Sequence, residues 1–172
     1  AGLPLSLQGP QGARFEGLGL GALGARALLF TWGDYIVSLQ AGVRAASPAA
    51  RLFLDMRDPV QADLRVLVGR PFEVFGLPGF LDAQFGYRSR GQNGDEIRAD
   101  FTAGLRPLPP LLLLAQSFSG FSPRGGPAGV VAAQKFQLSA VYDLNASLSL
   151  QIGAIAAIGG VNSPAERGLI SA

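Results

Sequence analysis

In three segments between positions 63 and 106, acidic and arginine side chains fall on alternate positions, a spacing that lets them act together. Successive side chains of a β-strand point to opposite faces, so residues two apart share a face. Opposed acids and arginines on neighbouring strands then attract one another across that face. This is chemistry of electrostatic recognition rather than of bond making. The set predicted to share the face is Asp63, Arg65, Asp82, Arg88, Arg90, Glu96, Arg98, Asp100 and Arg106.

Bond-making chemistry has little support in the residue types. The chain has no Cys and no His, which removes thiolate sites, the Ser-His-Asp triad and most zinc sites. A serine nucleophile would need Lys135 or a carboxylate as its base; the serines concerned are Ser117, Ser119, Ser122, Ser139, Ser147 and Ser149. We therefore expect no enzyme, no cofactor and no metal.

A second candidate site is the glycine-rich run with Gly17, Gly19, Gly21 and Gly24. A phosphate-binding loop would continue into Lys-Ser/Thr and a helix, and this run does not. The glycines are better explained by strand curvature or close packing. The net charge of +2 is spread along the chain, so no basic patch for nucleic acid is expected.

The composition points away from a helical membrane protein and toward a sheet. Hydrophobic residues make up 48% of the chain and charged residues only 15%. Even so, no apolar run reaches the roughly 18 residues of a spanning helix; Pro109 and Pro110 interrupt the strongest one. The 24 Gly and 12 Pro disfavour long helices and suit strands joined by turns.

The charged face is matched by an uncharged, apolar face. Ile97, Phe101 and Leu105 alternate with charged positions, and the same pattern recurs in the segments before and after. The alternating segments are about 10 to 13 residues long, whereas soluble strands average about 5 or 6 and membrane strands about 9 to 11. The pattern predicts apolar-out, polar-in transmembrane strands. Residues predicted to face lipid are Leu81, Phe85, Ile97, Phe101, Leu105, Phe136, Leu138, Leu148, Leu150 and Ile152.

Connection lengths provide an independent indication of the same fold. The predicted strands are 1–8, 15–31, 35–46, 60–70, 79–90, 95–106, 110–120, 131–143, 146–158 and 167–172. Their connections alternate between short and long, as in outer-membrane barrels with short periplasmic turns and longer external loops. The connection from Arg70 to Gly79 is the exception, being longer than a tight turn. The fold class predicted is all-β, an antiparallel transmembrane β-barrel with about ten strands in this chain.

Both ends fall inside predicted strands, and the terminal aromatic residue common in such barrels is missing. We expect residues 1–172 to be one barrel domain that is incomplete at both ends.

Several segments resemble parts of a known protein family. The stretches VSLQAGVR (37–44), GLPGFLDAQFGYRSR (76–90), LLLLAQSF (111–118), KFQLSAVYDL (135–144) and ERGLISA (166–172) resemble uncharacterised, porin-like outer-membrane proteins of alphaproteobacteria. The resemblance implies about twelve strands, a removed secretion signal and a bacterial outer-membrane location.

Two functions follow from this prediction. One is a passive pore for small polar solutes, in which charges facing the lumen set selectivity. The other is a closed structural barrel that anchors a partner, with paired charges filling the interior. Barrels of eight strands are filled by side chains and those of 16 to 18 hold a water channel, so ten to twelve strands allow either. A third function, that of a soluble or self-assembled all-β protein that stores a lipid, is disfavoured because its interior should then be apolar. The partners expected are outer-membrane lipid, other envelope proteins or further copies of the chain.

Overall fold

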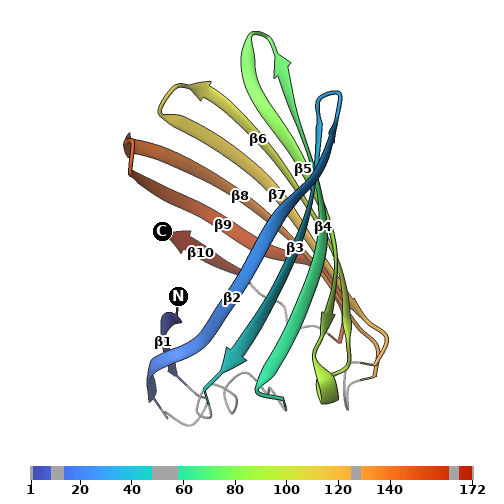
Figure 1. The fold of residues 1–172 in the computed structure, drawn as a ribbon. Coiled ribbons are helices and arrows are strands. Elements are labelled where there is room, and N and C mark those ends of the chain that lie inside the picture. Colours follow the sequence, from blue (N-terminus) through green and yellow to red (C-terminus); the bar gives the residue numbers. More distant parts are fainter. Residues whose placement is uncertain (1, 9–13, 48–57, 125–128, 163–166, 172) are drawn as a thin grey trace.

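The computed structural model describes residues 2–8, 14–47, 58–124, 129–162 and 167–171. The described strands are β1 (Gly2–Gln8), β2 (Arg14–Trp32), β3 (Tyr35–Ala46), β4 (Val60–Val74), β5 (Leu77–Ser89), β6 (Glu96–Leu108), β7 (Leu111–Ser122), β8 (Val131–Asn145), β9 (Leu148–Val161) and β10 (Arg167–Ser171). They form one sheet in the order β1 to β10, and every neighbouring pair is antiparallel (Figure 1). The predicted all-β antiparallel fold is confirmed.

The sheet has two free edges. Strands β1 and β10 each pair with a single neighbour, and no pairing among the described residues joins them to each other. The sheet is therefore open, and its closure into a barrel remains a proposal. Strand β2 also extends well beyond β1, because β1 pairs with it only between Arg14 and Gly21.

Turns on one side of the sheet are all of two residues. They are Gly33-Asp34, Phe75-Gly76, Pro109-Pro110 and Ala146-Ser147, at the β2–β3, β4–β5, β6–β7 and β8–β9 junctions. The other junctions are longer, and only one of them, between β5 and β6, is described throughout. It contains the 3₁₀ turn Gly91–Asn93. The predicted alternation of short and long connections therefore holds along the chain.

Two sequence-based boundaries were wrong. The strand predicted to end at residue 143 continues to Asn145, which moves its turn to residues 146–147; the larger difference concerns residues 70–79. The segment from Arg70 to Gly79, predicted to be a long connection, continues as strand to Val74 and resumes at Leu77. Two prolines fit there because the hairpin projects beyond its neighbours. The β3–β4 pairing ends at Gly69 and the β5–β6 pairing begins at Gly79, so Pro71 and Pro78 are each paired with a strand on one side only. On the unpaired side, the N–H that proline lacks is not needed for a ladder hydrogen bond.

Phe75 and Gly76 both have positive φ, 52° and 74°, as a two-residue type I′ turn requires. A bulky residue is unusual in that conformation. The Phe75 side chain is also 97% exposed at the hairpin tip. The turn is therefore apolar because it contains Phe75, a residue type that the positive φ of this position does not favour.

The two faces of the sheet differ sharply in exposure. Large apolar side chains such as Phe85 (62% exposed) stand open on one face, while Arg65, Arg88 and Asp100 are buried on the other. A flat single-layer sheet would leave both faces equally open. The polar face therefore lies on the concave side of the curved sheet, where side chains of neighbouring strands cover one another.

A conventional apolar core is absent from the described part of the chain. Within residues 21–47, 58–92, 94–124 and 129–162, for which burial is described, the buried hydrophobic residues are Ala46 and Leu67, and the other buried residues are polar, charged or glycine. Among the same residues, no helix is both long enough and apolar enough to cross a membrane.

Candidate functional site

The candidate site is a ladder of paired charges on the concave face, centred on β4, β5 and β6. Asp63 lies at its middle and binds two arginines. Its Oδ1 accepts a hydrogen bond from Arg65 Nε at 2.5 Å, and its Oδ2 accepts one from Arg88 Nε at 3.0 Å. Both arginines are held through one carboxylate, so this residue fixes two strands to each other.

The ladder continues onto β6. Arg65 Nη1 donates to Asp100 Oδ2 at 2.9 Å, and Arg98 Nη2 lies 3.5 Å from the same oxygen. Glu96 Oε2 lies 3.4 Å from Arg88 Nη1 and 3.7 Å from Arg90 Nη1. Seven of the nine predicted charges thus form one connected network, which comprises Asp63, Arg65, Arg88, Arg90, Glu96, Arg98 and Asp100.

Strand register explains this grouping. Asp63 is directly opposite Arg88, and Arg88 is directly opposite Glu96, so acid, base and acid alternate across three strands. The next row of the same face reads Arg65, Gly86 and Arg98. The glycine separates two like charges that would otherwise be adjacent.

Glycines let the long side chains lie flat against the sheet. A Cβ built at Gly86 would come within 2.8 Å of Arg65 Cγ, so the Arg65 side chain occupies the place of a missing side chain on β5. In the same way, Glu96 Oε1 would be 2.6 Å from a Cβ at Gly120 on β7. The charged groups therefore run along the wall of the sheet instead of projecting away from it.

Two polar atoms of the network lack partners. Arg88 is 7% exposed and Asp100 is 8% exposed, yet neither Arg88 Nη2 nor Asp100 Oδ1 makes a hydrogen bond. Unpaired buried groups of this kind are costly and deserve an explanation. The network is thus closely but not completely self-satisfied.

The remaining two predicted charges lie apart from the network. Asp82 accepts a hydrogen bond from Gln84 Nε2 at 2.7 Å. Arg106 pairs with Asp143 on β8 at 2.7 Å, near the short turns. Sequence reasoning placed both on the polar face, but did not identify Asp143 as the partner of Arg106.

An uncharged polar belt on the concave face was missed by the sequence reasoning. Gln137 on β8 donates to Gln116 Oε1 at 3.1 Å and to Ser139 Oγ at 2.8 Å, and Gln116 donates to Thr102 at 3.3 Å. The signal was present, because these residues occupy the same alternate positions as the charges. The belt lies between the charge network and the short turns.

The convex face carries the residues predicted to contact lipid. Nine of those ten side chains are exposed, and Leu105 is half-exposed. The face is not entirely apolar, because Ser117, Ser119 and Gln134 form a hydrogen-bonded group there. Ser117 and Ser119 were weighed from the sequence only as possible nucleophiles. Their hydrogen bonds with Gln134 pair polar groups on an otherwise apolar surface.

Aromatic residues gather on this face near the β2–β3 turn. The rings of Trp32 and Tyr35 stack with centroids 6.2 Å apart, and the Arg70 guanidinium lies 5.2 Å from the centre of the Tyr35 ring. Arg70 also donates to the Tyr35 hydroxyl at 3.3 Å and lies 4.0 Å from Asp34. Trp32 is 77% exposed, so the cluster presents a large amphipathic surface.

The opposite end of this face has an aromatic residue tied to a connection. The Tyr87 hydroxyl donates to Asp95, which also accepts from Ser89 Oγ and from the Arg90 backbone N–H, each at 3.2 Å. The Tyr87 hydrogen bond is the main cause that holds the pKa of the Asp95 carboxyl below its usual value of 3.8. Asp95 thus joins the end of β5 to the start of β6.

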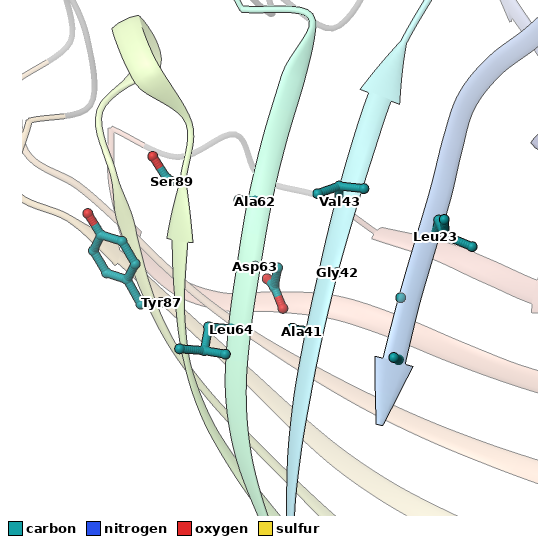
Figure 2. A pocket seen from close by; sticks show the side chains of 11 residues that line it. Leu23, Ala41, Gly42, Val43, Ala62, Asp63, Leu64, Tyr87 and Ser89 are labelled. Carbon is teal, nitrogen blue, oxygen red and sulfur yellow. The ribbon is translucent and has the colours of Figure 1, made fainter. Parts of the chain in front are cut away.

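A shallow hollow of about 680 Å³ crosses the convex face over β2 to β5 (Figure 2). Alanines cause it: Ala25, Ala41 and Ala62 stand among the larger Leu64 and Tyr87. The glycine-rich run of β2 also enters it through Gly24, and that run is strand rather than a phosphate loop. The lining is apolar, and its one charged member, Asp63, is held by arginines of the concave face.

In the described ranges, no group of three or more acidic side chains is arranged to hold a metal ion. No family model, no curated protein and no solved structure matches the chain.

Proposed function

We propose that this sheet is the greater part of an outer-membrane β-barrel that acts as a passive pore for small polar solutes. The observation that carries the proposal is the arrangement of charged side chains on the concave face, flat against the wall over glycines such as Gly86. Side chains held in this way line an interior without filling it. Solutes would diffuse down their gradient, with electrostatic filtering by the wall.

The convex face supports a membrane location. It exposes far more apolar surface than soluble monomers leave uncovered. Its tyrosines lie toward the two ends of the strands: Tyr87 is directly opposite Ile97, which is also opposite Phe121, while Tyr142 is directly opposite Leu111. Leu111 and Phe121 are ten residues apart on β7, or about 33 Å along a strand at roughly 3.3 Å per residue.

A strand tilted by about 45° would convert that length into a height of roughly 23 Å, close to the apolar band of about 25 Å in such barrels. Short turns on one side and longer connections on the other fit the same orientation, with the short turns in the periplasm. The resemblance to alphaproteobacterial outer-membrane proteins belongs to this proposal as well.

A closed structural barrel is the second candidate, and one observation favours it. Each carboxylate of the network contacts at least one arginine, and a paired charge is a weak ligand site. In that case the charges hold strands in register, and the barrel anchors a partner or stiffens the envelope.

Single-channel recording of the full-length protein in planar bilayers separates the two. The pore proposal predicts steady current steps with a zero-current potential in a salt gradient that shifts when Arg98 is replaced by Gln. A folded, heat-modifiable protein that never conducts would overturn it in favour of the structural barrel. Denatured protein from the same preparation serves as the control for leakage.

A further inference from the structure

Positive charge on the concave face is concentrated in the half nearer the long connections. By strand register, this half comprises the Asp63–Arg88–Glu96 row, the row beyond it toward the long connections, and the next two rows toward the short turns. Among the residues of β3 to β8 whose side chains the structure describes, the basic members are Arg44, Arg65, Arg88, Arg90, Arg98 and Lys135. The acidic members are Asp63, Glu96 and Asp100. Arginine and lysine are therefore in clear excess there.

The half nearer the short turns has no such excess. Asp82 lies there beside the glutamine and serine belt, and Arg106 is neutralised by Asp143. On β5, Arg88 and Asp82 are six residues apart, or about 20 Å along the strand. This separation exceeds the Debye length of about 8 to 10 Å at moderate salt, so the Asp82 carboxylate has little influence on the field at Arg88.

Arg88 is the centre of the positive half. The charges of Arg44 and Arg98 repel it, those of Glu96 and Asp63 attract it, and its Nη2 atom is buried without a partner. A guanidinium with an unused N–H beside other arginines is the arrangement that binds carboxylate and phosphate groups. An anion beside this cluster would offset the repulsion from Arg44 and Arg98.

We propose that this half of the concave face is a binding site for small anions of the carboxylate or phosphate class. Because the site lies toward one mouth, it makes the pore conduct unequally in the two directions. The inference rests on the pore function proposed above and adds its substrate class and its asymmetry. The short-turn half, lined by Gln116, Gln137 and Ser139, passes the ion without holding it.

The test is the current–voltage curve of the full-length protein in a bilayer of zwitterionic lipid, with identical KCl on both sides. The current at one polarity should exceed that at the other by roughly twofold in 0.1 M salt, and the ratio should approach one in 1 M salt, where charges are screened within about 3 Å. Inorganic phosphate should reduce the chloride current at lower concentration from one side than from the other.

Arg98→Gln and Arg44→Gln should each bring the current ratio toward one and weaken the effect of phosphate. Arg98 is preferred over Arg88 because Asp100 keeps its bond to Arg65 when Arg98 is removed. Arg106→Gln, in the other half, is the matched control and should leave the ratio unchanged. A linear, symmetric curve with equal phosphate effects would overturn this inference but keep the pore. Absence of any current would overturn both.

Discussion

Arg65 on β4 reaches Asp100 on β6 by passing over Gly86 of the intervening strand β5, with Nη1 and Oδ2 2.9 Å apart. The contact joins two strands that are not neighbours in the sheet. It depends on three residues in three strands, and a side chain at the middle position would block it. Glycine in a strand interior normally weakens the strand, and here it gives an ion pair room across two ladders.

Gly86→Ala should therefore destabilise the protein. The new Cβ would come within 2.8 Å of Arg65 Cγ and displace that side chain from Asp100. Loss of a buried charged hydrogen bond costs about 1–3 kcal/mol. The measurement is the urea midpoint of the protein refolded in lipid vesicles, with the denaturant slope checked for constancy.

Gly159→Ala in β9 is the matched control, since nothing lies within 4 Å of the Cβ it would add. It should be neutral or slightly stabilising, because alanine restricts the unfolded chain more than glycine. Equal destabilisation by both substitutions would show that loss of strand glycine, rather than displacement of Arg65, is responsible.

The alternation of residues was enough to predict most of this fold. Period-2 patterning located the strands because each face keeps one chemical character over a long run, as with Ile97 to Leu105 on β6. The error at residues 71–78 arose because proline usually ends a strand. Local sequence did not reveal that the pairing with β3 ends at Gly69 and the pairing with β6 begins only at Gly79, which is what allows Pro71 and Pro78 to remain in strands.

The sequence predicted which face of the sheet carries the site residues, but not which of those residues form ion pairs with one another. Parity put Asp63, Arg65 and Arg88 on one side, yet the pairings depend on register, which is a relationship between strands. The Arg106–Asp143 pair also needed knowledge of how β6 lies near β8. The role of Gly86 was unpredictable for the same reason, since it concerns a side chain from the strand before it.

Phe101→Arg tests the assignment of the convex face to lipid. Phe101 lies level with Ala83 and Ser117, near the middle of the sheet. Arginine at mid-membrane in a barrel costs about 2–4 kcal/mol, falling to about 0–1 near the interfaces. The variant should lose stability in vesicles by that amount and assemble poorly in outer membranes.

Leu148→Arg provides the depth control, because Leu148 begins β9 beside a short turn. It should cost far less than Phe101→Arg under the same conditions. Normal assembly and stability of the Phe101 variant would mean that this face does not meet hydrocarbon.

The chain's one tryptophan reports directly on membrane placement. Trp32 is on the convex face beside Tyr35 and Arg70, a combination typical of the membrane–water interface. In vesicles its emission should shift to the blue on folding. Lipids brominated near the headgroup should quench it more strongly than lipids brominated near the bilayer centre.

Iodide in the surrounding water should quench Trp32 weakly in the folded state and strongly in urea. Tyr35→Ala is a useful companion variant, since it removes the stacked ring without removing the probe. Strong iodide quenching of the folded protein, with none from brominated lipid, would place the β2–β3 turn in water.

Asp95 makes the β5–β6 connection sensitive to acid. Its folded-state pKa is lowered, chiefly by the hydrogen bond from Tyr87 and also by that from the Arg90 backbone. A lowered folded-state pKa means that the stabilisation is complete above the unfolded value near 3.8 and disappears as the pH falls through the folded value. Asp95→Asn should therefore lower the urea midpoint at pH 6, and the difference from the unsubstituted protein should shrink as the pH falls below the unfolded value near 3.8. Asp34→Asn, which removes only an exposed contact 4.0 Å from Arg70, should show a smaller difference at every pH. If the Asp95 variant and the unsubstituted protein differ by the same amount at pH 6 and at the lowest pH, the ionised carboxylate is not what ties the two strands together.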